Sequence, residues 1–332
     1  MIELSNQPKL YLAPMRGLTE ATYRNVFFRY FSGIDVAISP FITTVKGPSI
    51  SARHIKDILP KNNYSSIPLI PQLLSKDPDG FIRMANRLFD LGYENINWNL
   101  GCPYPMVAKK MRGSGLLPHA DIIDAFLDKV LSAIPNRLSL KTRLGRFNEN
   151  EILSLIPVFN RYPLSYIIIH PRTGKQMYDG TPNLDYFSEC LNLLKHPVVY
   201  NGDINCLSDF YNFANKFPSV DGWMIGRGML KNPFLGEIIQ TGKVQENTIE
   251  VFKQFHDDLF ECYQSTLNGP GHVLGKMKGH WQYMSRRFEN DRKLLKKIQR
   301  VSKLEHYETI VMEMFRQCRE KECLWKNVSS QE

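Results

Sequence analysis

The sequence of this 332-residue chain predicts an α/β fold, a (β/α)8 TIM barrel followed by a small all-helical C-terminal domain. Two observations lead to this fold class. Over the first two-thirds of the chain, short apolar runs alternate with longer segments of helical pattern. After about residue 242 the strand pattern stops, and helical periodicity continues to residue 326.

Eight apolar runs are predicted to be strands, and most of them are apolar throughout rather than alternating. That pattern is typical of parallel strands buried on both faces. Eight strands, each followed by helix over about 230 residues, match a (β/α)8 barrel. A doubly wound sheet is the alternative, because a sequence does not show whether a sheet closes. The predicted strands are 10–15, 36–41, 67–74, 95–101, 138–145, 166–173, 198–204 and 221–228.

Seven segments in the same region carry a helical pattern. The segment 77–91 is the best defined, since Asp77 and Pro78 open it and Gly92 follows its end. The predicted helices are 18–30, 77–91, 119–133, 149–161, 184–194, 207–216 and 233–239. The change of pattern then divides the chain into a barrel domain, 1–242, and a helical domain, 243–332. Residues 268–271 (Asn-Gly-Pro-Gly) interrupt the helical domain.

Composition excludes several classes of protein. Hydrophobic residues make up 43% of the chain and aromatic residues 11%, which excludes a disordered chain. No apolar run approaches ~18 residues, so we expect no membrane span. The N-terminal residues lack the basic and apolar regions of a secretory signal, so we expect a cytoplasmic protein. Six cysteines include no CxxC pair, and we expect no metal site.

Most of the positive charge lies in one segment. The whole chain carries +9, and residues 276–303 hold ten basic and two acidic residues, so this segment alone carries +8. A nearly neutral body with a basic late segment indicates contact with a polyanion. A solvated helix face is the alternative. Five of these residues follow one another at spacings of one, three and four, so several can share a helix face: Arg292, Lys293, Lys296, Lys297 and Arg300.

Polar residues and glycines occur where the predicted strands end. In a barrel the carboxyl ends of the strands meet at the face that carries the active site. Seven such ends in register therefore predict a large cofactor site: 14–17, 72, 99–103, 141–143, 170–172, 201–203 and 226–228. The last two follow strands seven and eight, where barrels commonly bind a phosphate. The alternative is that these glycines only serve turns.

Two side chains point to a flavin. Lys141 lies inside an apolar strand, where a cation is costly unless it meets an anion or a polar ligand edge. A cation near the N1/O2 edge of a flavin stabilises the reduced, anionic ring. Gln72 can donate and accept together, as the pyrimidine edge of a flavin requires. The alternatives are a lysine whose ammonium reaches water and, for His170, a core histidine bonded to a backbone carbonyl.

Cys102 is the strongest single candidate for a catalytic residue. It follows Gly101, precedes Pro103 and comes at a strand end, so we expect it in a tight loop above the barrel. Lys109, Lys110 and Arg112 follow it closely. A structural thiol is more often in the middle of a strand or on a buried helix face.

Six motifs, in the order of the chain, resemble the tRNA-dihydrouridine synthase family. They are LAPMRGLTE (12–20), NWNLGCPYPMVAKKMRGSGLL (97–117), LKTRLG (140–145), IHPRTGKQMYDG (169–180), VVYNGDI (198–204) and MIGRGMLKNP (224–233). The resemblance runs through the whole barrel, and the helical tail is similar to the RNA-binding domain of the family.

The resemblance also implies roles for individual residues. The active cysteine of the family matches Cys102. Its FMN contacts match Pro14, Met15, Arg16, Gln72, Lys141 and His170, and its phosphate-binding turns match Asn201, Gly202, Asp203, Gly226 and Arg227. The substrate side matches Asn99, Arg143, Arg172 and Tyr178, and the basic helical segment is expected to bind RNA.

The activity implied by the resemblance is reduction of the C5–C6 double bond of specific uridines in tRNA. NADPH or NADH first reduces bound FMN, RNA then enters, and Cys102 gives a proton to C5 as general acid. The target uridine must be flipped out of folded RNA. We expect the protein to be a monomer. The alternatives are a reductase of free pyrimidines similar to dihydroorotate dehydrogenases, dihydrouridine synthesis on ribosomal RNA, and a non-catalytic RNA-binding protein.

Overall fold

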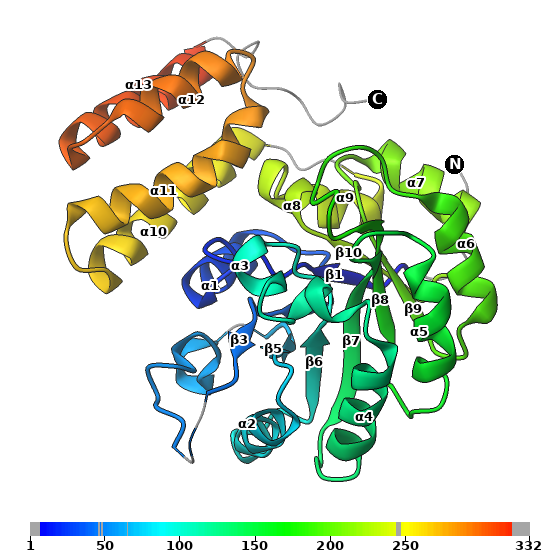
Figure 1. Ribbon diagram of the computed structural model, residues 1–332. Helices are drawn as coiled ribbons and strands as arrows, with labels where there is room; N and C mark the ends of the chain where they lie inside the picture. The colour runs from blue at the N-terminus through cyan, green and yellow to red at the C-terminus, as the bar shows by residue number, and fades with distance from the viewer. Residues whose placement is uncertain (1–6, 46, 48, 65, 244–246, 321–332) are drawn as a thin grey trace.

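The computed structural model describes residues 7–45, 47, 49–64, 66–243 and 247–320 (Figure 1). In this part of the chain all strands are parallel and belong to one sheet. The strands are β1 (Leu10–Leu12), β2 (Val36–Ile38), β3 (Ile42–Thr43), β4 (Leu69–Ile70), β5 (Gln72–Leu74), β6 (Asn95–Asn99), β7 (Arg137–Gly145), β8 (Ile167–Thr173), β9 (Val198–Asn201) and β10 (Gly222–Ile225).

Two prolines explain why eight predicted strands become ten. Pro40 separates β2 from β3, and Pro71 separates β4 from β5, because proline has no N–H to donate to a ladder. β4 pairs with β2, whereas β5 pairs with β3 and β6. Since β4 and β5 are consecutive pieces of one run and β1 pairs with both β2 and β10, the strands form a closed ring. The predicted barrel is confirmed, and the doubly wound alternative is wrong.

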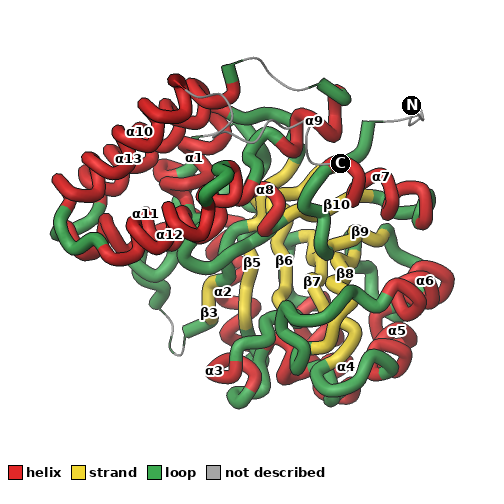
Figure 2. The backbone as a smooth tube through the Cα atoms, turned by 90° about the horizontal axis from the view of Figure 1, so that it is seen from above, coloured by secondary structure: helices red, strands yellow, loops and turns green. Residues whose placement is uncertain are grey.

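Helices surround the strands, as Figure 2 shows for α2, α4, α5, α6 and α7. The barrel helices are α1 (Ala21–Tyr30), α2 (Pro78–Asp90), α3 (Pro105–Ala108), α4 (Ala120–Leu131), α5 (Glu151–Phe159), α6 (Leu184–Leu193), α7 (Leu207–Lys216), α8 (Arg227–Lys231) and α9 (Leu235–Thr241). The expectation of a helix after every strand is wrong at one place. Between β3 and β4 the described residues form two 3-10 turns, Lys56–Ile58 and Pro60–Asn62, and no α-helix.

The strands are buried on both faces, as their apolar sequences predict. Successive side chains of a strand point to opposite faces. Leu10 and Leu12 of β1 belong to the main core cluster beneath the helices, whereas Tyr11 belongs to a separate cluster with Ile38, Met224 and other buried side chains. This packing holds the strand ends rigidly and so fixes the loops that follow them.

The predicted helical domain is present. Its helices are α10 (Thr248–Thr266), α11 (Pro270–Met284), α12 (Asp291–Arg300) and α13 (Leu304–Glu320). The predicted break corresponds to the turn between α10 and α11, where Gly269 takes a φ of +84°. Residues 321–332 of the predicted domain lie outside the described residues, as do 244–246 beside its boundary. In the described chain, every helix is too short or too polar to cross a membrane.

The helical domain packs against α1 of the barrel (Figure 1). Asp258 of α10 accepts a hydrogen bond from the Tyr30 hydroxyl at 2.7 Å and pairs with Arg29 at 3.1 Å. Tyr23 stacks on His280 of α11 with ring centroids 5.0 Å apart. These contacts hold α11 beside the carboxyl ends of the strands. The proposed boundary at residue 242 falls directly after α9, which ends at Thr241.

Candidate active site

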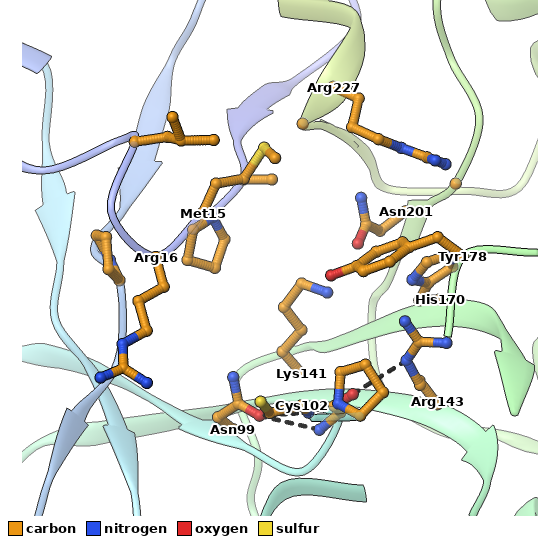
Figure 3. Close-up of a pocket in the computed structure, with 18 of the residues that line it drawn as sticks. Met15, Arg16, Asn99, Cys102, Lys141, Arg143, His170, Tyr178, Asn201 and Arg227 are labelled. Carbon is orange, nitrogen blue, oxygen red and sulfur yellow. Dashed lines mark hydrogen bonds between the residues drawn. The ribbon is translucent and has the colours of Figure 1, made fainter. Parts of the chain in front are cut away.

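A cavity of about 340 Å³ lies at the carboxyl ends of the strands, where the sequence predicts the cofactor site. Its volume is in the range of small-molecule sites. Gln72 and Arg172 are fully buried beside it rather than among its lining residues. All the other residues predicted for the barrel site line it (Figure 3): Pro14, Met15, Arg16, Asn99, Cys102, Lys141, Arg143, His170, Tyr178, Asn201, Gly202, Asp203, Gly226 and Arg227.

Cys102 lies in the loop between β6 and α3, and only 6% of the residue is exposed. Its N–H donates to Asn99 Oδ1 at 2.8 Å, and its carbonyl accepts from the N–H and the hydroxyl of Ser114, both at 3.0 Å. A Cβ placed on Gly113, where φ is +55°, would come within 2.8 Å of the Cys102 Cβ. The thiol is therefore held from both sides of its loop.

Burial raises the pKa of the Cys102 thiol, and this effect outweighs the N–H of Tyr104 and the charges of Arg143, Arg16 and Lys141, which lower the pKa. The thiol is consequently protonated at neutral pH. A protonated thiol beside a cavity suits a proton donor better than a nucleophile, which needs the thiolate.

Three basic side chains from β7 and β8 face the cavity. Lys141 and Arg143 are two residues apart on β7, so they point to the same face, and His170 pairs in register with Arg143. Burial, aided by the charge of Arg143, lowers the pKa of Lys141 to about 7. Burial and then four neighbouring cationic groups lower the pKa of His170 far below its usual value, so His170 is neutral.

The hydrogen bonds of His170 indicate its tautomer. Arg172 Nη1 lies 3.0 Å from His170 Nε2. Because a guanidinium only donates, Nε2 must accept, and Nδ1 carries the proton. The imidazole is thus a fixed donor and acceptor rather than a further positive charge in the cavity.

Lys141 has no compensating anion among the residues that the structure describes. Its ammonium makes no hydrogen bond or ion pair with any residue that the structure describes, and Figure 3 shows it pointing into the cavity. A cation in this position is costly to keep without an anionic or polar partner. The donor set of the cavity therefore fits an anionic, phosphate-bearing ligand such as a flavin mononucleotide.

An ion-pair cluster closes the side of the cavity near β9 and β10. Asp203 accepts from Arg172 Nη2 and Arg227 Nη2, both at 2.6 Å. Burial tends to raise the pKa of Asp203, but the hydrogen bond and charge of Arg172, with the charge of Arg227, lower it overall. The two arginines are thereby fixed beside Gly202 and Gly226, where the sequence predicts a phosphate.

Tyr178 stands at the mouth of the cavity between two arginines. The guanidinium carbons of Arg143 and Arg227 lie 5.3 and 5.2 Å from the centre of its ring. The residue is 42% exposed, so part of the ring faces solvent. An aromatic ring held in this way offers a surface on which a nucleobase can stack.

Sequence reasoning missed several lining residues. Phe41 follows β2, Tyr104 follows Cys102, and Tyr283 comes from α11 of the helical domain. The place of Tyr104 beside Cys102 was a usable signal. No pattern in the sequence indicates that Tyr283 reaches the barrel site, because that depends on how the two domains dock.

The basic segment divides into two groups in the structure. Four of its ten basic residues are engaged within the protein: Lys276 pairs with Glu20, Lys278 donates to the Val301 carbonyl, Arg286 pairs with Asp291, and Arg287 is buried. Part of the charge of the segment is therefore engaged within the protein, and the polyanion footprint stays a prediction. The predicted RNA-binding residues of α12 are all exposed: Arg292, Lys293, Lys296, Lys297 and Arg300.

Four of those α12 residues line a groove of about 660 Å³ between α12 and α13. The groove also contains Ser302, His306 and Thr309, which can form hydrogen bonds. Its cations are free to meet phosphates, because they lie at the surface rather than in ion pairs with described residues. Arg292 lies on the same helix outside the groove.

The fold and the cavity define a (β/α)8-barrel protein with a cation-lined site and a buried, protonated cysteine. The chain belongs to the dihydrouridine synthase family, whose model, described as Dihydrouridine synthase (Dus), matches residues 11–327. It is 28% identical over 235 residues to tRNA-dihydrouridine synthase B of Pasteurella multocida, covering 70% of this chain and 69% of that protein. It is 25% identical over 328 residues to tRNA-dihydrouridine(16) synthase of Neisseria meningitidis, covering 94% and 98%.

A solved structure supports the fold. The structure of morphinone reductase in complex with tetrahydroNAD matches with a TM-score of 0.52 and 10% identity, covering 74% of this chain and 90% of that one. At this level of identity the match shows the barrel fold alone.

Proposed function

We propose that this chain reduces the C5–C6 double bond of specific uridines in tRNA to 5,6-dihydrouridine, with FMN as bound cofactor and NADPH or NADH as reductant. The relatives named above, tRNA-dihydrouridine synthases, support the reaction and its substrate. The observation that carries the proposal is the presence of the protonated Cys102 thiol in the same cavity as the uncompensated Lys141 ammonium.

The residues around the cavity are assigned by their chemistry. Lys141 would stabilise the anionic edge of a bound flavin, with His170 as a neutral hydrogen-bonding neighbour. The turns at Asn201 and Gly226, with Arg227, would hold its phosphate. Pro14, Met15 and Arg16 would contact the ring, and Gln72 lies behind Asn99. A flavin reduced by the nicotinamide would supply the hydride for C6 of the uracil ring.

Cys102 is the proton donor in this proposal. Addition of hydride at C6 leaves negative charge that is relieved by a proton at C5. The raised pKa keeps the Cys102 thiol protonated, and its tight loop keeps it beside the cavity. Asn99 and Arg143 border the same space and are assigned to the uracil, whereas Tyr178 is available to stack on the flipped base.

The basic face of α12 is assigned to the RNA backbone. Its exposed cations lie on the helical domain, which α11 joins to the cavity through Tyr283. Such charges attract phosphates without reading bases. A reductase of free pyrimidines has no use for this face, so the proposal favours tRNA over free nucleosides. A tRNA substrate also agrees with a cytoplasmic reaction, and the monomeric state stays a prediction.

The experiment is a comparison of substrates. The purified protein is expected to be yellow and to release FMN on heating. Reduced with NADPH, it should then form dihydrouridine in tRNA transcripts in a single turnover, as mass spectrometry of the digested RNA measures. Free uridine and a ribosomal RNA fragment serve as competing substrates. Reduction of free uridine at the rate of tRNA, or of the ribosomal fragment alone, would contradict the proposal.

A further inference from the structure

A chain of buried polar side chains crosses the barrel interior below Cys102. Gln72 of β5, Asn97 of β6 and Ser139 of β7 are direct partners in the strand register. None is more than 1% exposed. The interior of such barrels is usually filled by bulky apolar side chains, and buried polar groups are tolerated only when they are hydrogen-bonded. Three polar residues at one level therefore require an explanation.

The hydrogen bonds of this chain all run in one direction. The Ser139 hydroxyl donates to the Ile96 carbonyl at 3.1 Å, so its lone pairs accept Asn97 Nδ2 at 2.8 Å. Asn97 Oδ1 then accepts Gln72 Nε2 at 2.8 Å. Because a carbonyl only accepts, the backbone of Ile96 fixes the orientation of every side-chain amide above it.

The upper end of the chain reaches the Cys102 loop. Gln72 Oε1 accepts Asn99 Nδ2 at 2.7 Å, which turns Asn99 Oδ1 toward the loop. That oxygen accepts the N–H of Gly101 at 3.1 Å and the N–H of Cys102 at 2.8 Å. If the Asn99 amide were flipped, its NH2 group would face the N–H groups of Gly101 and Cys102. Both N–H groups would then lack an acceptor. The orientation of Asn97 and Ser139 is therefore coupled to the position of the cysteine.

We propose that Asn97 and Ser139 are positioning residues, which act through Gln72 and Asn99 to hold the Cys102 thiol at the cavity. The expected effect on the reaction rests on the proposed function. The expected effect on the position of the thiol rests on the hydrogen-bond chain alone. A loop that loses its anchor exposes the thiol and misplaces it. A misplacement of about 1 Å can cost about 10²-fold in rate.

The test compares two substitutions at Asn97 with a matched control. Asn97→Leu removes both hydrogen bonds at similar volume. Asn97→Asp keeps them in its protonated form, which burial favours, because an aspartic acid accepts from Gln72 and donates to Ser139, whose own hydrogen stays on the Ile96 carbonyl. Asn136→Leu removes another buried asparagine, 6% exposed and bonded to the Tyr93 carbonyl at 2.6 Å, at the amino end of β7.

Two measurements are made on each variant. The first is dihydrouridine formed in a single turnover by pre-reduced enzyme, compared with flavin reduction by NADPH. We expect about 10²-fold slower product formation for Asn97→Leu, with a much smaller change in flavin reduction. The second is alkylation of Cys102 by iodoacetamide without RNA, followed by mass spectrometry of its peptide. Alkylation should accelerate in Asn97→Leu and keep the unmodified protein's rate in Asn97→Asp and Asn136→Leu.

Equal effects of Asn97→Leu and Asn136→Leu, or an Asn97→Asp variant as impaired as Asn97→Leu, would overturn the inference. If the unmodified protein makes no dihydrouridine, the proposed function fails, while the alkylation pattern still decides on the hydrogen-bond chain. Should Asn97→Leu not fold, Ser139→Ala removes only the lowest link, and faster alkylation of Cys102 is again the expected result, with an unchanged rate against the inference.

Discussion

The cavity and α12 are both basic, but their cations lie in opposite surroundings. Burial lowers the pKa of Lys141 to about 7 and that of Arg143 to about 10. The side chains of Lys293, Lys296 and Arg300 on α12 are exposed to water. A buried cation interacts strongly with one well-placed anion, whereas exposed cations attract a polyanion over a distance and are screened by salt.

This difference shows that the net charge of a segment does not by itself identify a binding site. The +8 segment includes Lys276, Lys278, Arg286 and Arg287, whose roles lie within the protein. Conversely, the barrel domain carries +6 over residues 1–242, and it gathers the cations that matter most at one cavity. We therefore expect that substitutions in the cavity impair the reaction, and that substitutions in α12 impair tRNA binding, each without the other effect.

The largest effect is expected for Cys102→Ala. Loss of a positioned general acid costs about 10²–10⁴-fold in rate. Dihydrouridine formation on tRNA should fall by this factor in a single turnover, whereas flavin content and reduction by NADPH should remain, because the thiol acts only after RNA has bound. Cys262→Ala, a half-buried cysteine of the helical domain, is the control and should behave as the unmodified protein. Unchanged product formation in Cys102→Ala would remove the thiol from the mechanism.

Reversing the charge of Lys293, Lys296 and Arg300 to glutamate tests the other region. If each side chain neutralises a phosphate, tRNA affinity should fall steeply in the triple variant. The log–log salt slope should flatten by about 0.7–0.9 for each phosphate that is no longer neutralised. Flavin content and NADPH oxidation should not change. The measurement is a salt titration of tRNA binding by the two proteins.

The matched control carries the same change of charge at the opposite end of the barrel. Arg137, Lys195 and Lys216 are exposed near the amino ends of the strands. Their reversal alters net charge equally but leaves α12 intact. If both triple variants lose the same affinity and the same slope, RNA responds to overall charge, and α12 has no special part.

The sequence predicted the site well where chemistry and strand ends coincide. Lys141, His170 and Cys102 stand out because a polar or reactive side chain follows an apolar run, and parallel strands bring such ends together. Arg172 and Gln72 were selected by the same signal, yet they lie behind the lining. The signal gives the end of a strand but not the depth at which a side chain packs.

What the sequence did not predict depends on pairing and docking. The role of Asn97 requires Gln72 and Ser139 at the same level of neighbouring strands, and that register is set by the whole barrel. Tyr283 reaches the cavity only because α11 packs beside it. Arg287 is counted as charge in a sequence, but in the structure it is 1% exposed. Each of these is a long-range contact without a local pattern.

A smaller effect concerns the pH dependence of the flavin-free protein. The folded chain holds the pKa of Lys141 at about 7 instead of 10.5. Between about pH 7 and pH 10 the unfolded chain therefore binds a proton there that the folded chain does not, so stability should rise with pH. Lys141→Met should lose this rise. The measurement is the difference in Tm between the two proteins at pH 7 and pH 9, with exposed Lys216→Met as control. Parallel Tm curves for Lys141→Met and the unmodified protein would contradict the buried, unpaired lysine.

The smallest effect is expected for Gly113→Ala, which tests how tightly the Cys102 loop is packed. At a φ of +55°, an alanine costs about 1–2 kcal/mol of backbone energy. Its Cβ would also lie 2.8 Å from the Cys102 Cβ, so the loop must shift.

Gly242→Ala is the control, because Gly242 has a φ of +67° with no atom within 4 Å of the added Cβ. Chemical denaturation should show a small loss of stability in Gly242→Ala and a larger one in Gly113→Ala, whose added Cβ meets the Cys102 loop. Only Gly113→Ala should also change the alkylation rate of Cys102 and slow dihydrouridine formation. The same rates in both variants would mean that the thiol tolerates a shift of its loop, and that its place in the cavity is less strictly set than the contacts of Asn99 and Ser114 imply.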